Sequence, residues 1–187
     1  PETLNLDPDA VREAIEAERG EIDAILAVHL YGLPAPMDEL GAIADEHGVP
    51  LIADAAQAHG ASVRGRPIGS LADVSCFSFY PTKNMTTGEG GIVLTDDDAV
   101  ANRVARFVNH GRAGPYEHAS VGHNFRLTSI GGAIGTEQLQ RLDGFVDVRR
   151  RNAAAYDDAV ADTQWITPPV DPDGVRHAYH QYTVQCD

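Results

Sequence analysis

Two apolar runs decide the fold, "DAILAVHLYG" at residues 23–32 and "VPLIADAA" at residues 49–56. Each run has the length of a buried strand, and a glycine ends the first one. Residues 36–48 between them have the spacing of an amphipathic helix, which Pro36 opens and Gly48 closes. A strand, a helix and a strand with tight connections predict a βαβ unit, whose strands are parallel with a right-handed crossover.

Polar residues stand at the carboxyl ends of both predicted strands. His29 ends the first strand and Asp54 ends the second. In open α/β sheets, ligands bind outside the carboxyl ends of the strands. We therefore expect both side chains to point toward one crevice.

A third strand is predicted in "ADVSCFSFYPTK", residues 72–83, which Lys83 closes. Ser78 and Tyr80 fall on one face of this strand. The next apolar run, "GGIVLT" at residues 90–95, follows after a gap that is too short for a crossover helix. We therefore expect this run to lie antiparallel beside the third strand, in an otherwise mostly parallel sheet flanked by helices.

Helices and loops are expected on either side of this centre. Asp7 caps a first helix that Gly20 ends, and residues 96–111 form another helix with acidic residues in its first turn. The later part of the chain predicts four segments: a loop over 112–124, a helix over 128–161 with a break near Gly144, a proline-rich linker over 166–174 and a strand over 177–187.

The composition excludes several classes of function. The formal net charge is −14 and the acidic residues are spread along the chain. This argues against binding to nucleic acid or to anionic membranes. It favours a protein from a high-salt cytoplasm over a protein that is merely acidic. Cys76 and Cys186 have no metal-binding spacing, so we expect a reduced, cytoplasmic setting and no metal. The sequence has no evident signal peptide and no apolar stretch that could span a bilayer.

Lys83 is the only lysine, in a chain with thirteen arginines. A solvated surface charge is the ordinary role of a lysine, but an arginine could serve that role here. An arginine cannot lose its proton and attack a carbonyl carbon, whereas a partly desolvated lysine can. Lys83 is therefore a candidate Schiff-base nucleophile for pyridoxal phosphate.

Three other residues match the demands of that cofactor. Asp54 can hold the proton on the ring nitrogen, Gln57 can donate to the phenolic oxygen, and the Ser78 hydroxyl can bind the phosphate. Taken singly, Asp54 could be a cap and Ser78 a core hydroxyl. Their combination with a lone lysine favours the cofactor site.

Four motifs resemble, in order, those of the DegT/DnrJ/EryC1/StrS aminotransferases: "VHLYG", "DAAQAHGA", "CFSFYPTKNMTTGEGG" and "GHNFRLTSIGGAIGTEQLQRLD". The resemblance implies pyridoxal-phosphate enzymes of the aspartate-aminotransferase fold type, which act on nucleotide-linked keto sugars. It implies three parts here: large domain over 1–143, connecting helix and linker over 144–168, and the start of a small α+β domain over 169–187.

The resemblance also implies roles for individual residues. Lys83 would be the Schiff-base lysine and general acid/base, and Asp54, Gln57 and Ser78 would bind the cofactor. Asn124 would reach the phosphate of the neighbouring subunit, which implies a homodimer. His29, His59 and Tyr80 line the same region, either as contacts to the substrate or as supporting residues.

Family members are considerably longer than this chain and carry a glycine–threonine–serine phosphate loop that is missing here, so the sequence resembles an internal fragment. The expected reaction is transamination of a nucleotide-linked keto sugar, with glutamate as the amino donor. One alternative is a sugar dehydratase of the same family, in which histidine replaces the lysine. Another is a non-catalytic nucleotide-binding or regulatory module, although "GEGG" at residues 88–91 lacks the preceding strand and following helix of a dinucleotide loop.

Overall fold

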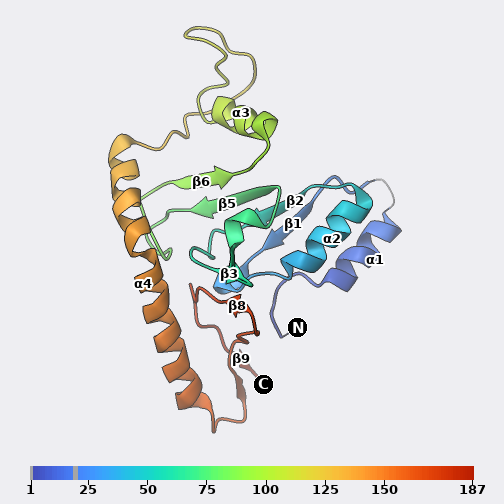
Figure 1. Ribbon diagram of the computed structural model, residues 1–187, viewed down its shortest axis with the longest axis vertical. Helices are drawn as coiled ribbons and strands as arrows, with labels where there is room; N and C mark the ends of the chain where they lie inside the picture. The colour runs from blue at the N-terminus through green and yellow to red at the C-terminus, as the bar shows by residue number, and fades with distance from the viewer. Residues whose placement is uncertain (1, 19–20) are drawn as a thin grey trace.

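A four-stranded sheet forms the centre of the computed structural model, which describes residues 2–18 and 21–187 (Figure 1). Its strand order is β1-β2-β5-β6, where the strands are β1 (Ile25–Val28), β2 (Leu51–Asp54), β5 (Val74–Ser78) and β6 (Gly91–Leu94). β1, β2 and β5 are parallel, and β6 pairs antiparallel with β5. The predicted sheet, including its antiparallel strand, is confirmed.

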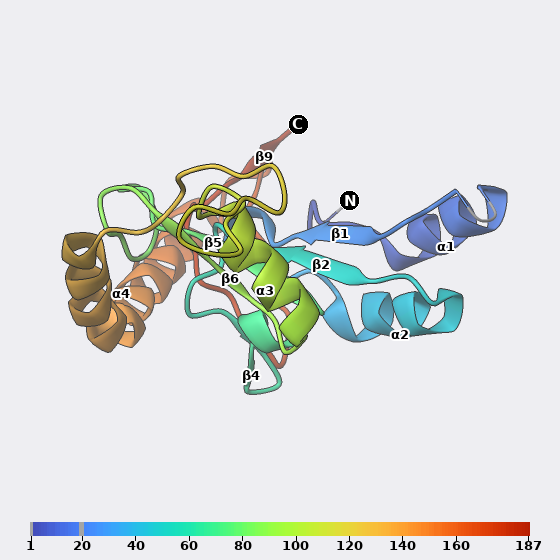
Figure 2. The ribbon, with the colours of Figure 1, turned by 90° about the horizontal axis from the view of Figure 1, so that it is seen from above.

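Two helices pack together at one end of the sheet, α1 (Pro8–Ala17) and α2 (Met37–His47) (Figures 1 and 2). The Asp7 carboxylate accepts the Asp9 N–H at 2.9 Å and so caps α1 as predicted. The predicted end of that helix at Gly20 lies outside the described residues. Gly48 closes α2 in the left-handed conformation, with φ +66°. Leu40 and Ile43 of α2 are buried in the main core, whereas His47 is exposed.

The other two helices are α3 (Asp98–Phe107) and α4 (Ser129–Val160). The predicted break near Gly144 is wrong, because α4 continues through it for 32 residues. A glycine inside a helix costs only about 1 kcal/mol, and the buried Leu142 and Val146 hold α4 on both sides of it. The proposed domain boundary between residues 143 and 144 therefore falls inside one continuous helix.

Short elements complete the fold. The hairpin β3 (Ser62–Val63) and β4 (Arg66–Pro67) pairs with β8 (Val175–Arg176), and β7 (Ile166–Thr167) pairs with β9 (Gln185–Cys186). Two 3₁₀ turns are η1 (Leu30–Gly32) and η2 (Ile68–Ser70).

The predicted strand over 177–187 is wrong except for β9. Residues 177–184 have no strand structure, and Tyr179 has a φ of +44°. The alternating residue pattern that predicted a strand here reflects side-chain packing instead, since the rings of His177 and Tyr179 stack with centroids 3.8 Å apart. Its backbone bonds to η1 instead of to a ladder, with the Ala178 N–H donating to the Gly32 carbonyl at 2.9 Å.

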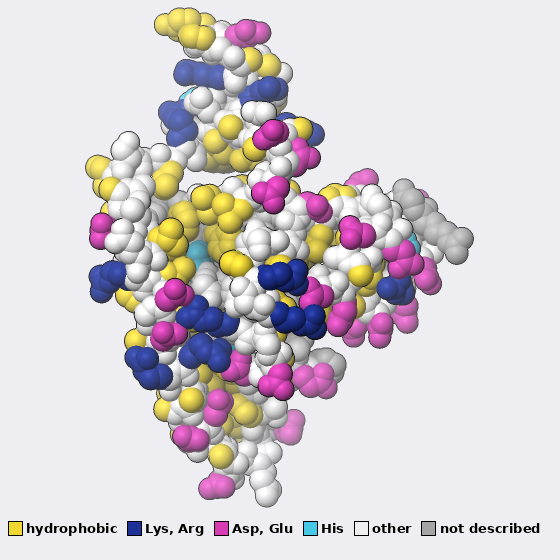
Figure 3. All heavy atoms as spheres, in the orientation of Figure 1, with side chains coloured by type: hydrophobic (Ala, Val, Ile, Leu, Met, Phe, Trp, Pro, Cys, Tyr) yellow, Lys and Arg dark blue, Asp and Glu magenta, His cyan; other side chains and the backbone are white. Residues whose placement is uncertain are grey.

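The sheet is less enclosed than the apolar runs predict. β1 alternates between buried and exposed residues, and Leu26 is 57% exposed. All four residues of β6 are exposed. An apolar groove of about 1000 Å³ lies between β6, α3 and α4, and hydrophobic side chains gather in this part of the surface in Figure 3. No helix among the described residues is long and apolar enough to cross a membrane.

Candidate active site

The carboxyl ends of the three parallel strands meet at one edge of the sheet. The register pairs Val28 with Asp54 and Asp54 with Cys76, so the residues that follow these positions are neighbours. The His29 N–H donates to the Asp54 carbonyl at 3.0 Å, and the Ala55 N–H donates to the Cys76 carbonyl at 2.8 Å. This edge therefore brings together the backbone around His29 and Asp54 and the end of β5, which leads to Lys83.

Lys83 lies in the compact loop between β5 and β6. The loop is closed at its base, where the Phe79 N–H donates to the Gly90 carbonyl at 2.8 Å and the Lys83 N–H donates to the Tyr80 carbonyl at 3.0 Å. Met85 is buried against Leu142 and Val146 of α4. The loop is thus packed against α4, and Lys83 within it is partly exposed.

Asp54 and His29 are close at the end of the first two strands. The side chain of His29 is completely buried, and its Nδ1 accepts the Ala35 N–H at 3.0 Å. Burial lowers the pKa of His29 to about 4, although the Asp54 charge opposes this shift. The ring is therefore neutral at pH 7, with its proton on Nε2, which has no hydrogen-bond partner among the described residues. A buried neutral ring beside Asp54 favours a supporting role for His29 over contact with a substrate.

Gln57 and Ser78 make local contacts at the same edge. The Gln57 Oε1 accepts the Tyr31 N–H at 2.6 Å. The Ser78 Oγ accepts the Tyr80 N–H at 3.3 Å, and Tyr80 itself is 48% exposed. A carboxylate, an amide and a hydroxyl thus lie at or just after the carboxyl ends of the strands, and the loop that follows β5 carries the Lys83 amine.

His59 is buried behind Lys83. Its ring packs against Phe77 and Phe79, with centroids 5.2 Å and 6.0 Å away. Burial lowers the pKa of His59 to about 4, the backbone of Ser78 opposes this shift, and the positive charge of Lys83 adds to it. His59 is therefore another uncharged ring at neutral pH.

His180 is a candidate that the sequence analysis missed. The Asn84 side-chain amide, next to Lys83, donates to the Ala178 carbonyl at 2.8 Å and so ties this segment to the lysine loop. Burial, with the charges of Lys83 and Arg149, lowers the pKa of His180 to about 4. Its Nδ1 is buried without a hydrogen-bond partner in the described part of the chain. The alternating residue pattern predicted a strand over this segment and did not mark His180 as a site residue. Only its tertiary contacts identify it.

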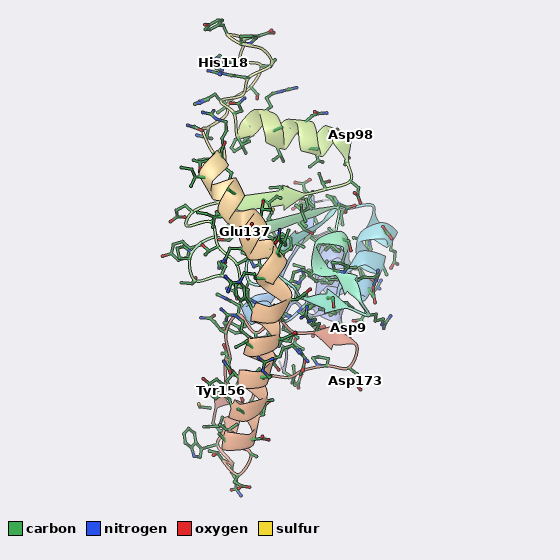
Figure 4. All side chains as sticks on the ribbon, turned by 60° about the vertical axis from the view of Figure 1, so that its left-hand side comes forward. Asp9, Asp98, His118, Glu137, Tyr156 and Asp173 are labelled. Carbon is green, nitrogen blue, oxygen red and sulfur yellow. The ribbon has the colours of Figure 1, made fainter. Side chains whose placement is uncertain are left out.

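Asn124 is not brought to this edge within one chain. It is exposed, at the end of the loop that follows α3, and its backbone bridges to Asn109. This loop projects beyond α3 in Figure 1, and Figure 4 shows His118 of the same loop at the far end of the molecule from Asp173. Among the described residues, no cluster of three or more acidic, histidine or cysteine side chains could hold a metal.

The whole chain matches one protein family. Residues 1–187 match the DegT/DnrJ/EryC1/StrS aminotransferase family, and the chain belongs to it. It is 40% identical to the dTDP-3-amino-3,4,6-trideoxy-alpha-D-glucose transaminase of Streptomyces venezuelae, over 97% of this chain and 48% of that protein. It is 37% identical to the UDP-2-acetamido-2-deoxy-3-oxo-D-glucuronate aminotransferase of Pseudomonas aeruginosa, over 100% of this chain and 51% of that protein.

A solved structure supports the same relationship. The chain superposes on DesV of S. venezuelae, crystallised in complex with a ketimine intermediate, with a TM-score of 0.93 and 40% sequence identity. That match covers 99% of this chain and 49% of DesV. The chain thus spans about half the length of the relatives it matches.

Proposed function

We propose that the complete protein is a pyridoxal-phosphate-dependent aminotransferase that moves an amino group from glutamate to a nucleotide-linked keto sugar. The observation that carries the proposal is the position of Lys83. The only primary amine among the side chains of this chain lies in a closed loop at the same strand ends as Asp54. The two relatives described above are named as transaminases of nucleotide-linked sugars.

The residues present fit this cofactor. Its aldehyde needs an amine, its ring nitrogen needs a carboxylate, and its phenolic oxygen and phosphate need hydrogen-bond donors. Lys83, Asp54, Gln57 and Ser78 supply these groups at one edge. The buried histidine nitrogens there that have no hydrogen-bond partner within the described chain include Nε2 of His29 and Nδ1 of His180. Unpaired buried polar atoms are rare, and they are expected where a ligand completes the site.

The roles of the residues follow from their chemistry. When bound, the cofactor supplies an electron sink that stabilises negative charge at the α-carbon of the amino acid. Asp54 would hold the ring nitrogen protonated, and the neutral His29 beside it adds no positive charge next to the carboxylate. Lys83 would hold the cofactor through its aldehyde group, and its free amine would move the proton at the α-carbon of the amino acid. His59 and His180, both within range of the Lys83 charge, are uncharged at neutral pH and so do not compete with the amine for protons.

The complete protein is further proposed to be a homodimer that works in the cytoplasm, with Asn124 serving the cofactor phosphate of the partner subunit. The exposed loop that ends at Asn124 supports this, since it contains Arg112 and is closely followed by Arg126, and arginines suit an anionic group. Figure 3 shows basic side chains gathered in this projecting part of the molecule.

Isotope transfer tests the proposed reaction. The complete protein is incubated with pyridoxal phosphate, ¹⁵N-glutamate and a panel of keto sugars linked to dTDP or UDP, and the products are analysed by mass spectrometry. The proposal predicts a ¹⁵N-amino sugar from at least one of them, with release of 2-oxoglutarate. A product that has lost a hydroxyl group and gained no nitrogen would indicate a dehydratase instead. Retention of every sugar unchanged, with no visible absorption band from bound cofactor, would indicate a non-catalytic binding module.

A further inference from the structure

Tyr31 lies in the "VHLYG" motif but has no role in the proposed chemistry, and its backbone is unusual. Its φ is +58° and its ψ is 5°, the left-handed region that side chains other than glycine rarely adopt. Gly32 follows with a φ of +97°. Such strained residues persist only where their surroundings hold them, and they gather at functional sites. The contacts of this turn therefore indicate what the strain achieves.

The turn is wedged between two segments of the candidate site. On one side the Tyr31 N–H donates to the Gln57 Oε1 at 2.6 Å. On the other side the Gln181 N–H donates to the Tyr31 carbonyl at 3.2 Å. A Cβ atom on Gly32 would lie only 2.9 Å from the backbone oxygen of Gln57 and 2.9 Å from the backbone nitrogen of His180. A larger residue at position 32 would push these two segments apart.

This geometry orients the side-chain amide of Gln57. A backbone N–H can only donate, so the atom that faces Tyr31 must be the amide oxygen. The amide nitrogen then points away from Tyr31, and it can act only as a donor. The left-handed turn thus converts a side chain that could donate or accept into one that presents a donor.

We propose that Tyr31 is a positioning residue: its backbone N–H holds Gln57 so that the Gln57 Nε2 donates to the phenolic oxygen of the cofactor. This inference rests on the proposed function, because it requires pyridoxal phosphate at this edge. A hydrogen bond donated to that oxygen favours its deprotonated form. Tyr31 therefore lowers the pH at which the absorption of the bound cofactor changes.

Two variants of Gln57 separate the two ends of its amide. Gln57→Glu keeps an oxygen for the Tyr31 N–H but loses the donor, whereas Gln57→Leu loses both. Gln138→Glu is the matched control. The Gln138 Oε1 also accepts a backbone N–H, from Thr86 in the lysine loop at 3.3 Å, but Gln138 has no role in the proposed site. Hydrogen exchange of the Tyr31 amide is measured in the cofactor-free complete protein. The pH midpoint of the visible absorption is measured after loading with pyridoxal phosphate.

The proposal predicts that Gln57→Leu speeds exchange at Tyr31 by about three- to tenfold, the scale of one hydrogen bond, while Gln57→Glu leaves it slow. Both variants raise the absorption midpoint by about one pH unit, and Gln138→Glu changes neither quantity. Unchanged exchange in Gln57→Leu, or an unchanged midpoint in Gln57→Glu, would overturn the inference. Failure of the proposed function is a separate result: reduction with borohydride would then leave Lys83 unlabelled, while the exchange measurement would still report on Tyr31 and Gln57.

Discussion

Buried neutral histidines are the main feature of the candidate site at the scale of single residues. Burial lowers the pKa values of His29, His59, His177 and His180 to about 4. A histidine exposed to water has a pKa of about 6.5. Near Lys83, His59 and His180 therefore provide hydrogen-bonding atoms without adding positive charge.

These histidines should make the protein sensitive to mild acid. The unfolded chain binds protons at histidine near pH 6.5, whereas the folded chain binds them only near pH 4. Their contribution is therefore fully present above pH 6.5 and is lost as the pH falls through 4. For a fully buried ring such as His29 we expect a loss on the order of 1–3 kcal/mol. Urea unfolding of the complete protein between pH 7 and pH 4 measures it.

The control for this prediction is a pair of substitutions. His29→Gln should flatten the dependence of stability on pH, because it removes a group that binds a proton only in the unfolded state. His47→Gln, at an exposed position at the end of α2, should leave the dependence unchanged. Equal slopes for the two variants would mean that His29 is not held neutral by burial.

The site residues that the sequence predicts are those whose signals are local. A lone lysine after a strand and an aspartate at the end of another strand suffice to predict Lys83 and Asp54 at one edge, because parallel strands end together. His180 could not be found in this way. Its position depends on hydrogen bonds from Asn84 and Arg149 to the segment around it, which lies far from both along the chain. The hydrogen bond from the Tyr31 backbone N–H to the Gln57 side chain is likewise tertiary.

Elements with a continuous pattern were predicted well, and short or ambiguous ones were not. The βαβ unit and the antiparallel β6 follow from apolar runs and connection lengths. The β3–β4 hairpin was missed because its turn, at Arg64 and Gly65, has positive φ at both residues without an Asn-Gly or Asp-Gly signal. At Gly144 the buried neighbours of α4 outweighed the low helix propensity of glycine.

Two glycines of α2 provide a test of how local geometry sets stability. Gly41 lies inside the helix and Gly48 caps it with a φ of +66°, and a Cβ atom at either position would meet nothing within 4 Å. Gly41→Ala should stabilise the protein by about 0.5–1 kcal/mol, because alanine is the better helix former. Gly48→Ala should destabilise it by about 1 kcal/mol through backbone strain. Urea unfolding measures both, and effects of the same sign would contradict the assigned cap.

The whole molecule is strongly acidic and leaves apolar surface uncovered. It has a formal charge of −14, and the groove between β6, α3 and α4 is largely apolar. The exposed loop that ends at Asn124 projects away from the sheet edge that carries Lys83 (Figure 1). If Asn124 serves a partner subunit, the active unit must contain two shared sites.

Mixed dimers test this arrangement. Lys83→Ala and Asn124→Ala chains of the complete protein should each be inactive or impaired alone. In a mixed dimer one site collects both lesions and the other site is intact, so we expect activity to return to about half of the wild-type value per mixed dimer. Subunit exchange is verified with two affinity tags. Proven exchange without any recovery of activity would indicate that Asn124 acts within its own chain, for example as a loop or helix cap.

The most direct test of the central claim is the identity of the residue that bonds to the cofactor. The complete protein is loaded with pyridoxal phosphate, reduced with borohydride, digested and analysed by peptide mass spectrometry. The account predicts a stable pyridoxyl label on Lys83, no label in Lys83→Ala, and a retained label with little turnover in Asp54→Ala. A label on any other group, or none on Lys83 in protein that is shown to be folded, would contradict it.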